Sequence, residues 1–178
     1  LFAVVTSQWS PLLTGAALSP GWAAAFACKP TLGLALVAWR PSWRAALLAG
    51  GFTALSLVIW PAWPWAWFEA TAGAVHITAP VTRPGGVLML AALWRWRHPS
   101  ARLLLALAVL PQPPLLYEGV ALFLIAETWL QSGTLSVLSW IAWSLVYPAE
   151  GDQLAEGIRS GQVMIWTMYV PATLMVLW

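Results

Sequence analysis

Lys29 is the residue with the clearest chemical implication in this sequence. It stands between two apolar runs, residues 23–28 and 31–39, and Pro30 follows it directly. An ionisable side chain in the middle of an apolar stretch is costly in a membrane and indicates a functional site by default. An ammonium group with three donors suits a phosphate or pyrophosphate headgroup. The alternative is a lysine whose aliphatic stem carries its charge to the membrane surface.

Other side chains that could bind a sugar phosphate or move a proton lie in predicted loops and helix breaks. Tyr117 and Glu118 follow a proline-rich break, where Glu118 could bind substrate or only stabilise a helix start. Arg83 precedes a Pro-Gly-Gly segment whose amides could bind an anion, although an interfacial arginine is the alternative. Glu69 and His76 could hydrogen-bond a sugar or accept a proton, or could be solvated loop residues.

Several kinds of site have no support in the sequence. A lone Cys28 excludes an internal disulfide and a cysteine-based metal centre, and two distant histidines do not make a metal site. No phosphate-binding loop, nucleophile elbow or zinc-protease motif is present. The acidic side chains of segment 147–161 are explained by a surface loop. We therefore predict no metal and no cofactor.

The composition indicates that lipid is the solvent of this chain. Only 8% of the residues are charged, 61% are hydrophobic and the mean hydropathy is +0.76, whereas about a quarter of a soluble domain is charged. Backbone groups in a bilayer are satisfied only by helices or closed barrels, and the apolar runs here are unbroken rather than alternating. The sequence therefore predicts an all-α, polytopic transmembrane bundle. The net charge of +2 is no signal for a nucleic-acid partner.

Two clusters of arginines predict the orientation of the helices. They lie at 40–44 and 95–102, and short cytoplasmic loops carry such an excess. We expect helices over 45–60 and 135–146 to run outward, and 86–94 and 162–178 to return. Segment 61–84 is then an outer connection, whose tryptophans fit an interfacial belt.

Proline interrupts two pairs of apolar runs, 23–28 with 31–39 and 102–110 with 115–126. Runs of about 9 to 12 residues make roughly 14 to 18 Å of helix, too short for a hydrocarbon core of about 30 Å. Proline also removes an amide donor and disfavours helix at the preceding residue. Each pair is therefore either one kinked helix or two half-helices in a re-entrant hairpin.

The first residue is not methionine and lies in an apolar run without a signal-peptide pattern. We expect a single transmembrane domain over 1–178, a fragment that lacks N-terminal helices. The expected location is the bacterial inner membrane, crossed several times.

Three short stretches resemble a known enzyme family. They are SQWSPLL at 7–13, CKPT at 28–31 before the basic loop at 40–44, and PPLLYE at 113–118. Together they are similar to polyprenyl-phosphate-sugar-dependent glycosyltransferases of the C-type membrane fold, in particular glycosyltransferase family 87. The resemblance covers residues 6–146 and rests on short motifs. Where family members have glycine before the glutamine, this chain has Ser7.

The resemblance implies a sugar donor linked to a lipid phosphate, with chemistry on the extracytoplasmic side. Gln8 and Lys29 would line the donor headgroup site, and the catalytic carboxylate would lie in an early outer loop outside this chain. We therefore expect part of a lipid-linked-sugar glycosyltransferase. The alternative is a non-catalytic accessory subunit packed in a larger photosynthetic or respiratory membrane complex. A transporter with broken helices is a third possibility, but it would require an inverted repeat.

Overall fold

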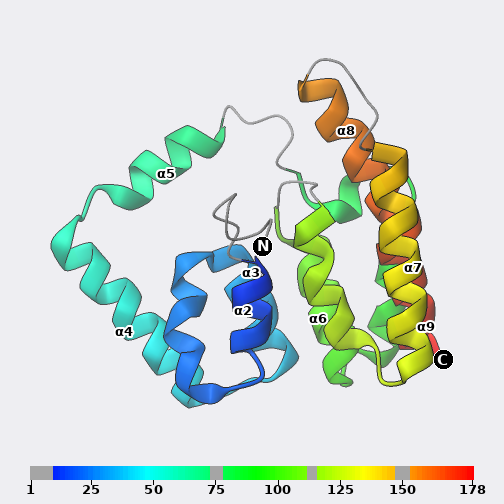
Figure 1. The fold of residues 1–178 in the computed structure, drawn as a ribbon. Coiled ribbons are helices and arrows are strands. Elements are labelled where there is room, and N and C mark those ends of the chain that lie inside the picture. The colour runs from blue at the N-terminus through cyan, green and yellow to red at the C-terminus, as the bar shows by residue number, and fades with distance from the viewer. Residues whose placement is uncertain (1–9, 73–77, 112–115, 147–152) are drawn as a thin grey trace.

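The computed structural model describes residues 10–72, 78–111, 116–146 and 153–178 (Figure 1). These residues fold into helices joined by short connections, and they form no β-sheet. The predicted all-α fold class is therefore confirmed. In chain order the elements are α2 (Ser10–Ala16), η1 (Pro20–Cys28), α3 (Pro30–Trp39), α4 (Trp43–Ile59), α5 (Trp63–Ala72), η2 (Pro80–Thr82), η3 (Gly86–Arg95), α6 (Pro99–Val109), η4 (Leu116–Ile125), α7 (Trp129–Val146), α8 (Gln153–Met164), η5 (Ile165–Tyr169) and α9 (Val170–Leu177).

Three of these elements are unusually long 3-10 helices, and one is a π-helix. η1, η3 and η4 have nine or ten residues each, although 3-10 runs beyond three or four residues are uncommon. η5 is a five-residue π segment that joins α8 to α9 without a break in the helix. Proline supplies many helix starts, because it lacks the amide that the first turn leaves unpaired. Elements with proline at their first or second position include η1, α3, η2, α6 and α9.

The helices of the bundle alternate in direction, except that α5 is bent by 98° from α4 and that α8, η5 and α9 form one continuous helix (Figure 1). η1 and α3 lie antiparallel and meet at Lys29, so the first proline-interrupted pair is a hairpin and not a kinked helix. α6 and η4 also run antiparallel, while the turn between them, residues 112–115, lies outside the described residues. We call residues 28–30 the hairpin tip. The directions of α4, η3, α7 and α9 agree with the predicted order of outward and returning helices.

Gly33 permits the close packing of this hairpin. A Cβ atom at Gly33 would collide with the backbone carbonyl of Phe26 on η1. Phe26, Leu32 and Leu36 are buried in the resulting contact. α6 then packs against α3 and lies at the centre of the molecule, with most of its side chains buried: Ser100, Ala101, Leu103, Leu104, Leu107 and Ala108.

The hairpin tip lies at an intermediate depth of the bundle. α3 ends and α7 begins at the same end of the molecule (Figure 1). α3 has 10 residues and α7 has 18, so at 1.5 Å per residue they rise about 15 and about 27 Å from that end. Lys29, at the start of α3, therefore lies about halfway along the height of α7. The chain thus reverses at this level, which corresponds to the hairpin, one of the two alternatives that the sequence left open for residues 23–39.

The outer helices expose large apolar side chains on nearly every side. Only Ala45 of α4 is buried, and on α7 only Leu135 and Ala142 are. The other large apolar side chains of these two helices are mostly exposed; Val58 and Trp140, for example, are 81% and 72% exposed. Soluble monomers rarely expose continuous apolar surfaces of this kind. These faces are therefore suited to lipid or to a partner protein.

By length and composition, one helix among the described residues is suited to cross a membrane. This helix covers Ile158–Leu177 and has 20 residues, and half of its most apolar segment is buried inside the molecule. α4 and α5 are long and apolar enough to cross a membrane only when they are taken together, and they are bent by 98° at the break between them. The shorter apolar helices include Pro30–Trp39, Gly86–Arg95 and Pro99–Val109. The predicted outer connection 61–84 thus contains a helix, α5, that composition alone did not indicate.

Candidate functional site

Lys29 lies at the hairpin tip and contacts α2. Its Nζ donates a hydrogen bond to Ser10 Oγ at 3.2 Å, and Ser10 is fully buried at the first position of α2. Two of the stretches that carry the family resemblance therefore meet in space, because Ser10 belongs to SQWSPLL and Lys29 to CKPT. Sequence reasoning did not single out Ser10, although it stands in the quoted motif.

The local electrostatics at Lys29 favour an anion. Lys29 is the N-cap residue of α3, and no side chain caps this helix start. The N-terminus of a helix carries the positive end of its dipole, so a cation there is disfavoured by about 0.3–1 kcal/mol. Lys29 is also the C-cap residue of η1, whose dipole has its negative end there, so the dipoles of η1 and α3 offset each other at this residue. The positive potential at the hairpin tip therefore comes from the ammonium, which a phosphate group would complement.

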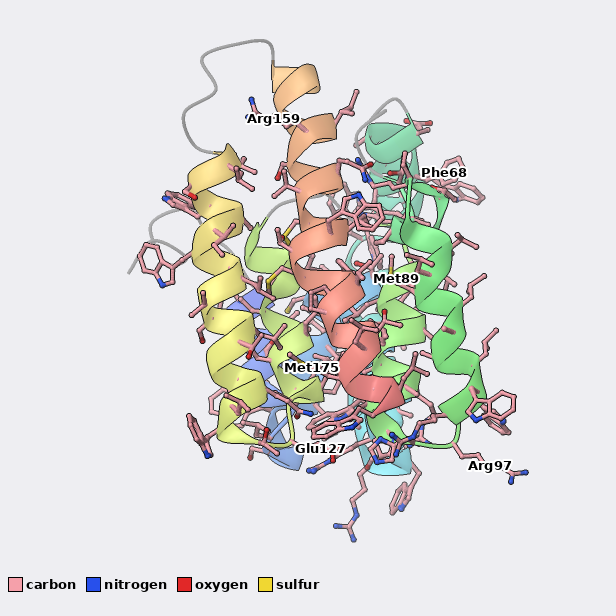
Figure 2. All side chains as sticks on the ribbon, turned by 90° about the vertical axis from the view of Figure 1, so that its right-hand side faces the viewer. Phe68, Met89, Arg97, Glu127, Arg159 and Met175 are labelled. Atoms are coloured by element: carbon pink, nitrogen blue, oxygen red, sulfur yellow. The ribbon has the colours of Figure 1, made fainter. Side chains whose placement is uncertain are left out.

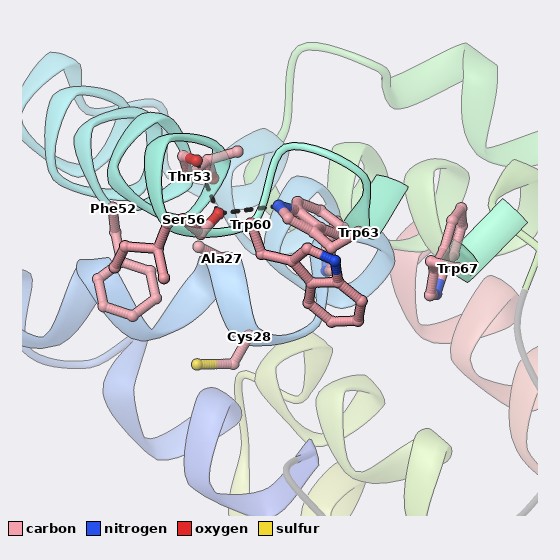
Figure 3. A pocket seen from close by; sticks show the side chains of 10 residues that line it. Ala27, Cys28, Phe52, Thr53, Ser56, Trp60, Trp63 and Trp67 are labelled. Atoms are coloured by element: carbon pink, nitrogen blue, oxygen red, sulfur yellow. Dashed lines mark hydrogen bonds between the residues drawn. The ribbon is translucent and has the colours of Figure 1, made fainter. Parts of the chain in front are cut away.

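An open cavity adjoins the hairpin tip on the side of α4 and α5 (Figure 3). Its volume is about 460 Å³, within the range of small-molecule sites. We call it the tryptophan cavity, and its walls are Ala27, Cys28, Pro30, Phe52, Thr53, Ser56, Ile59, Trp60, Trp63 and Trp67. Cys28 and Pro30 flank Lys29 in the chain, so the cavity and the cation share the same short segment.

The bend between α4 and α5 forms one wall of the tryptophan cavity. The Trp63 indole Nε1 donates to Ser56 Oγ at 3.1 Å across the bend, and Ser56 Oγ donates to the Thr53 carbonyl at 2.7 Å (Figure 3). These bonds connect the last turns of α4 to the first turn of α5. The sequence interpretation placed the tryptophans of this region in an interfacial belt and missed that they line a concave surface.

Arg83 lies on another part of the molecule, between η2 and η3. Its Nη1 donates to the Ile158 carbonyl of α8 at 3.4 Å, and Gln162 Nε2 donates back to the Pro84 carbonyl at 2.8 Å. Burial lowers the pKa of Arg83, but a guanidinium remains charged at neutral pH. These two hydrogen bonds connect the turn at Arg83 and Pro84 to α8.

The glycines after Arg83 serve packing in the structure. Gly85 has φ +82°, and a Cβ there would lie 2.6 Å from the Trp166 ring. The Gly86 amide donates to the Arg83 carbonyl at 2.8 Å. The interpretation that these amides present themselves to an anion is therefore not supported for Gly86, whose amide closes the turn.

The remaining predicted site residues are only partly covered by the structure. Glu69 is exposed on α5. Tyr117 and Glu118 fall in η4, but their side chains lie outside the described part of the structure. Gln8 and His76 lie outside the described residues altogether. Their convergence on Lys29 therefore stays a prediction.

The arginines gather at the opposite end of the bundle, which we call the arginine end. Arg102 joins the two clusters: its guanidinium donates to the Ala38, Trp39 and Arg97 carbonyls at 2.8, 3.2 and 2.7 Å. Arg95 Nη1 donates to the Val176 carbonyl at 2.8 Å, near the end of α9. Figure 2 shows Arg97 and Glu127 at this end, and Arg159 and Phe68 at the other. The predicted common placement of the two clusters at one end is confirmed.

The arginine end also carries stacked arginine–tryptophan pairs and a contact between a histidine and a carboxylate. Each guanidinium lies over the indole that precedes it in the chain: Arg40 over Trp39, Arg44 over Trp43 and Arg97 over Trp96, at 4.4, 5.5 and 5.5 Å. His98 Nε2 lies 3.6 Å from Glu127 Oε1. Such cation–aromatic pairs are typical of the border between an apolar phase and water.

No protein-family model, curated protein or solved structure matches this chain.

Proposed function

We propose that this chain is a multi-spanning part of a membrane glycosyltransferase that binds a lipid-phosphate-linked sugar donor. The observation that carries the proposal is the position of Lys29. It is a cation at the N-terminus of a half-helix, at the tip of a hairpin that turns back at an intermediate depth. Charges at such positions are costly and are retained for ligands or ion pathways.

The surroundings support a membrane location crossed several times. α4 and α7 expose apolar side chains on nearly all sides, and both arginine clusters lie at one end. If the arginine end faces the cytoplasm, the hairpin tip opens toward the extracytoplasmic side. In a bacterium this membrane is the inner one, where polyprenyl-phosphate sugars are presented.

The proposed reaction is an inverting transfer. A carboxylate outside this segment takes the proton of the acceptor hydroxyl, whose oxygen attacks the anomeric carbon of the sugar. The bond between that carbon and the phosphate oxygen breaks, and the lipid phosphate leaves with the electron pair. Lys29, held by Ser10 and next to the α3 N-terminus, stabilises the charge of the departing phosphate.

A lipid-binding titration tests the proposal. The protein in nanodiscs is titrated with polyprenyl phosphate and with the uncharged polyprenol, and the bound lipid is counted by native mass spectrometry. We expect the phosphate to bind at least about tenfold more tightly, since a charged contact contributes about 1.5–3 kcal/mol. Lys29→Gln should remove this preference, whereas the control Arg44→Gln at the arginine end should retain it. Equal binding of both lipids by the unaltered protein would contradict the proposal.

A second function, that of an accessory subunit in a larger membrane complex, has one specific observation in its favour. The exposed face of α7 carries Trp140 and Trp143, at 72% and 37% exposed, which would suit contact with a neighbouring subunit. Extraction in a mild detergent separates the two functions. A stoichiometric membrane partner together with no polyprenyl-phosphate binding would favour the accessory subunit.

A further inference from the structure

We propose that the tryptophan cavity binds the isoprenoid chain of a lipid whose anionic headgroup lies at Lys29. This inference rests on the proposed function for the identity of the lipid. The cavity itself was not part of the predicted site, and its chemistry differs from that of a headgroup site.

The walls of the cavity are suited to a hydrocarbon. No charged side chain lines it. Its hydroxyl groups make hydrogen bonds within the wall: Thr53 Oγ1 donates to the Ala49 carbonyl at 2.9 Å, and Ser56 Oγ bonds both Thr53 and Trp63. The remaining surface consists mainly of indole and phenyl rings and short aliphatic groups. Such a surface gains free energy by covering apolar ligand area and offers little to a polar ligand.

The cavity opens to the apolar outside of the molecule. Phe52, Trp60 and Trp67 line it and are each about half exposed, at 48, 58 and 50%. Val58 and Ile59, on the adjoining surface of α4, are more exposed still. A lipid chain can therefore enter from the membrane phase without crossing water.

The position of Lys29 selects an anionic lipid. Cys28 and Pro30 belong to the cavity wall, and Lys29 lies between them in the chain with its ammonium at Ser10. A chain in the cavity would thus place its terminal phosphate at the one cationic side chain of the hairpin tip. The two parts of the ligand match the two parts of the site, apolar wall and positive tip.

The 98° bend between α4 and α5 is what makes the surface concave. A continuous straight helix would carry Trp63 and Trp67 away from the hairpin tip. Pro61 and Pro64 stand at the bend, and the Trp63–Ser56 hydrogen bond connects its two sides. The bend is therefore a structural requirement of the proposed chain site.

Cys28 provides a direct measurement of occupancy, because it lines the cavity, is exposed and is the sole cysteine of the sequence. The rate of Cys28 alkylation by a maleimide is measured in nanodiscs without added ligand, and with polyprenol, polyprenyl phosphate or phosphatidylglycerol at equal mole fraction. We expect both isoprenoids to slow alkylation at least about fivefold and phosphatidylglycerol to leave it unchanged. Polyprenyl phosphate should act at the lower concentration.

Two matched variants locate the protection. Trp60→Ala should abolish protection by the isoprenoids, while Trp140→Ala on the exposed face of α7 should retain it. If Trp60→Ala alters the alkylation rate without ligand, Phe52→Ala, on the α4 wall, takes its place. Retained protection in both wall variants would overturn the inference.

The outcomes distinguish the chain site from the proposed function. Absence of protection by either isoprenoid overturns the chain site, whatever Lys29 does. Equal protection by phosphatidylglycerol overturns the isoprenoid assignment in favour of ordinary lipid. Protection by polyprenol and polyprenyl phosphate at the same concentration supports the chain site but contradicts the proposed phosphate role of Lys29.

Discussion

The two ends of α3 place a cation in different electrostatic settings. At its C-terminus the Arg102 guanidinium donates to the Ala38 and Trp39 carbonyls, where the helix dipole is negative and a cation is favoured. At its N-terminus Lys29 stands where the α3 dipole is positive, but η1 ends at the same residue with the opposite sign. The first arrangement stabilises the fold. The second gains little from the backbone, and a charge without such structural support is expected at functional sites.

The arginine end repeats the favourable arrangement. Arg95 donates to the Val176 carbonyl near the C-terminus of α9, as Arg102 does for α3. At this end a positive charge is therefore a structural element, and removing it should lower stability. At the hairpin tip, where Lys29 lies between the C-terminus of η1 and the N-terminus of α3, a smaller effect is expected.

The largest effect should come from Arg102→Gln. The change removes charged hydrogen bonds to carbonyls of α3 and of the turn before α6, which should lower the free energy of unfolding by about 3 kcal/mol. Thermal unfolding in a fixed detergent measures it. Arg97→Gln, at an exposed and stacked arginine, is the control and should change stability by less than about 0.5 kcal/mol. Equal effects of the two changes would remove the structural role assigned to Arg102.

A second variant tests whether the hairpin keeps the two ends of α3 in place. Gly33→Ala forces a methyl group against the Phe26 carbonyl and should cost about 2 kcal/mol through overpacking. Gly50→Ala on α4 is the matched control, because nothing lies within 4 Å of its Cβ position. Its higher helix propensity should raise stability by about 0.5 kcal/mol. A neutral Gly33→Ala would show that η1 and α3 are not packed this closely.

Arg95, which donates to a carbonyl near the C-terminus of α9, should have a smaller and local effect on stability. Arg95→Gln loses one charged hydrogen bond to the Val176 carbonyl and should cost about 1.5 kcal/mol. Hydrogen exchange should accelerate in the last turn of α9 and remain unchanged in α3. Acceleration spread evenly over both helices would contradict this assignment.

The smallest effect is expected for Lys29→Met. Without ligand, the dipoles of η1 and α3 offset each other at this residue, so the main loss is the hydrogen bond to Ser10, and the free energy of unfolding should fall by no more than about 1 kcal/mol. The same unfolding assay measures it. If the free energy of unfolding fell by more than about 2 kcal/mol, Lys29 would stabilise the fold as Arg102 does, and the two ends of α3 would not differ in this respect.

The sequence predicted those features that depend on local residue chemistry. An isolated lysine between apolar runs and two groups of arginines are visible without a structure, and the structure places the arginines together at one end. The proline at position 30 indicated a break, but whether the chain kinks or reverses depends on packing. Gly33 against Phe26 decides it, and that contact joins residues on different elements.

The tryptophan cavity could not be predicted for a related reason. Its walls come from the hairpin tip and from both sides of the bend between α4 and α5, so no single stretch carries the pattern. The tryptophans near the bend have the composition of an interfacial belt, and only the 98° angle turns them toward Cys28. The signal that could have been used is the spacing of Pro61 and Pro64 on either side of Trp63.

The π segment η5 has a consequence for the long helix that contains it. Buried positions recur along this helix at a spacing of four: Ser160, Met164, Met168, Ala172 and Val176. In a regular α-helix each step of four residues overshoots a full turn by about 40°, so the stripe would wind around the axis and leave the core. The wider π turn rotates less per residue and corrects much of this angular drift. The helix can thus remain against the bundle to its end, where Val176 meets Arg95.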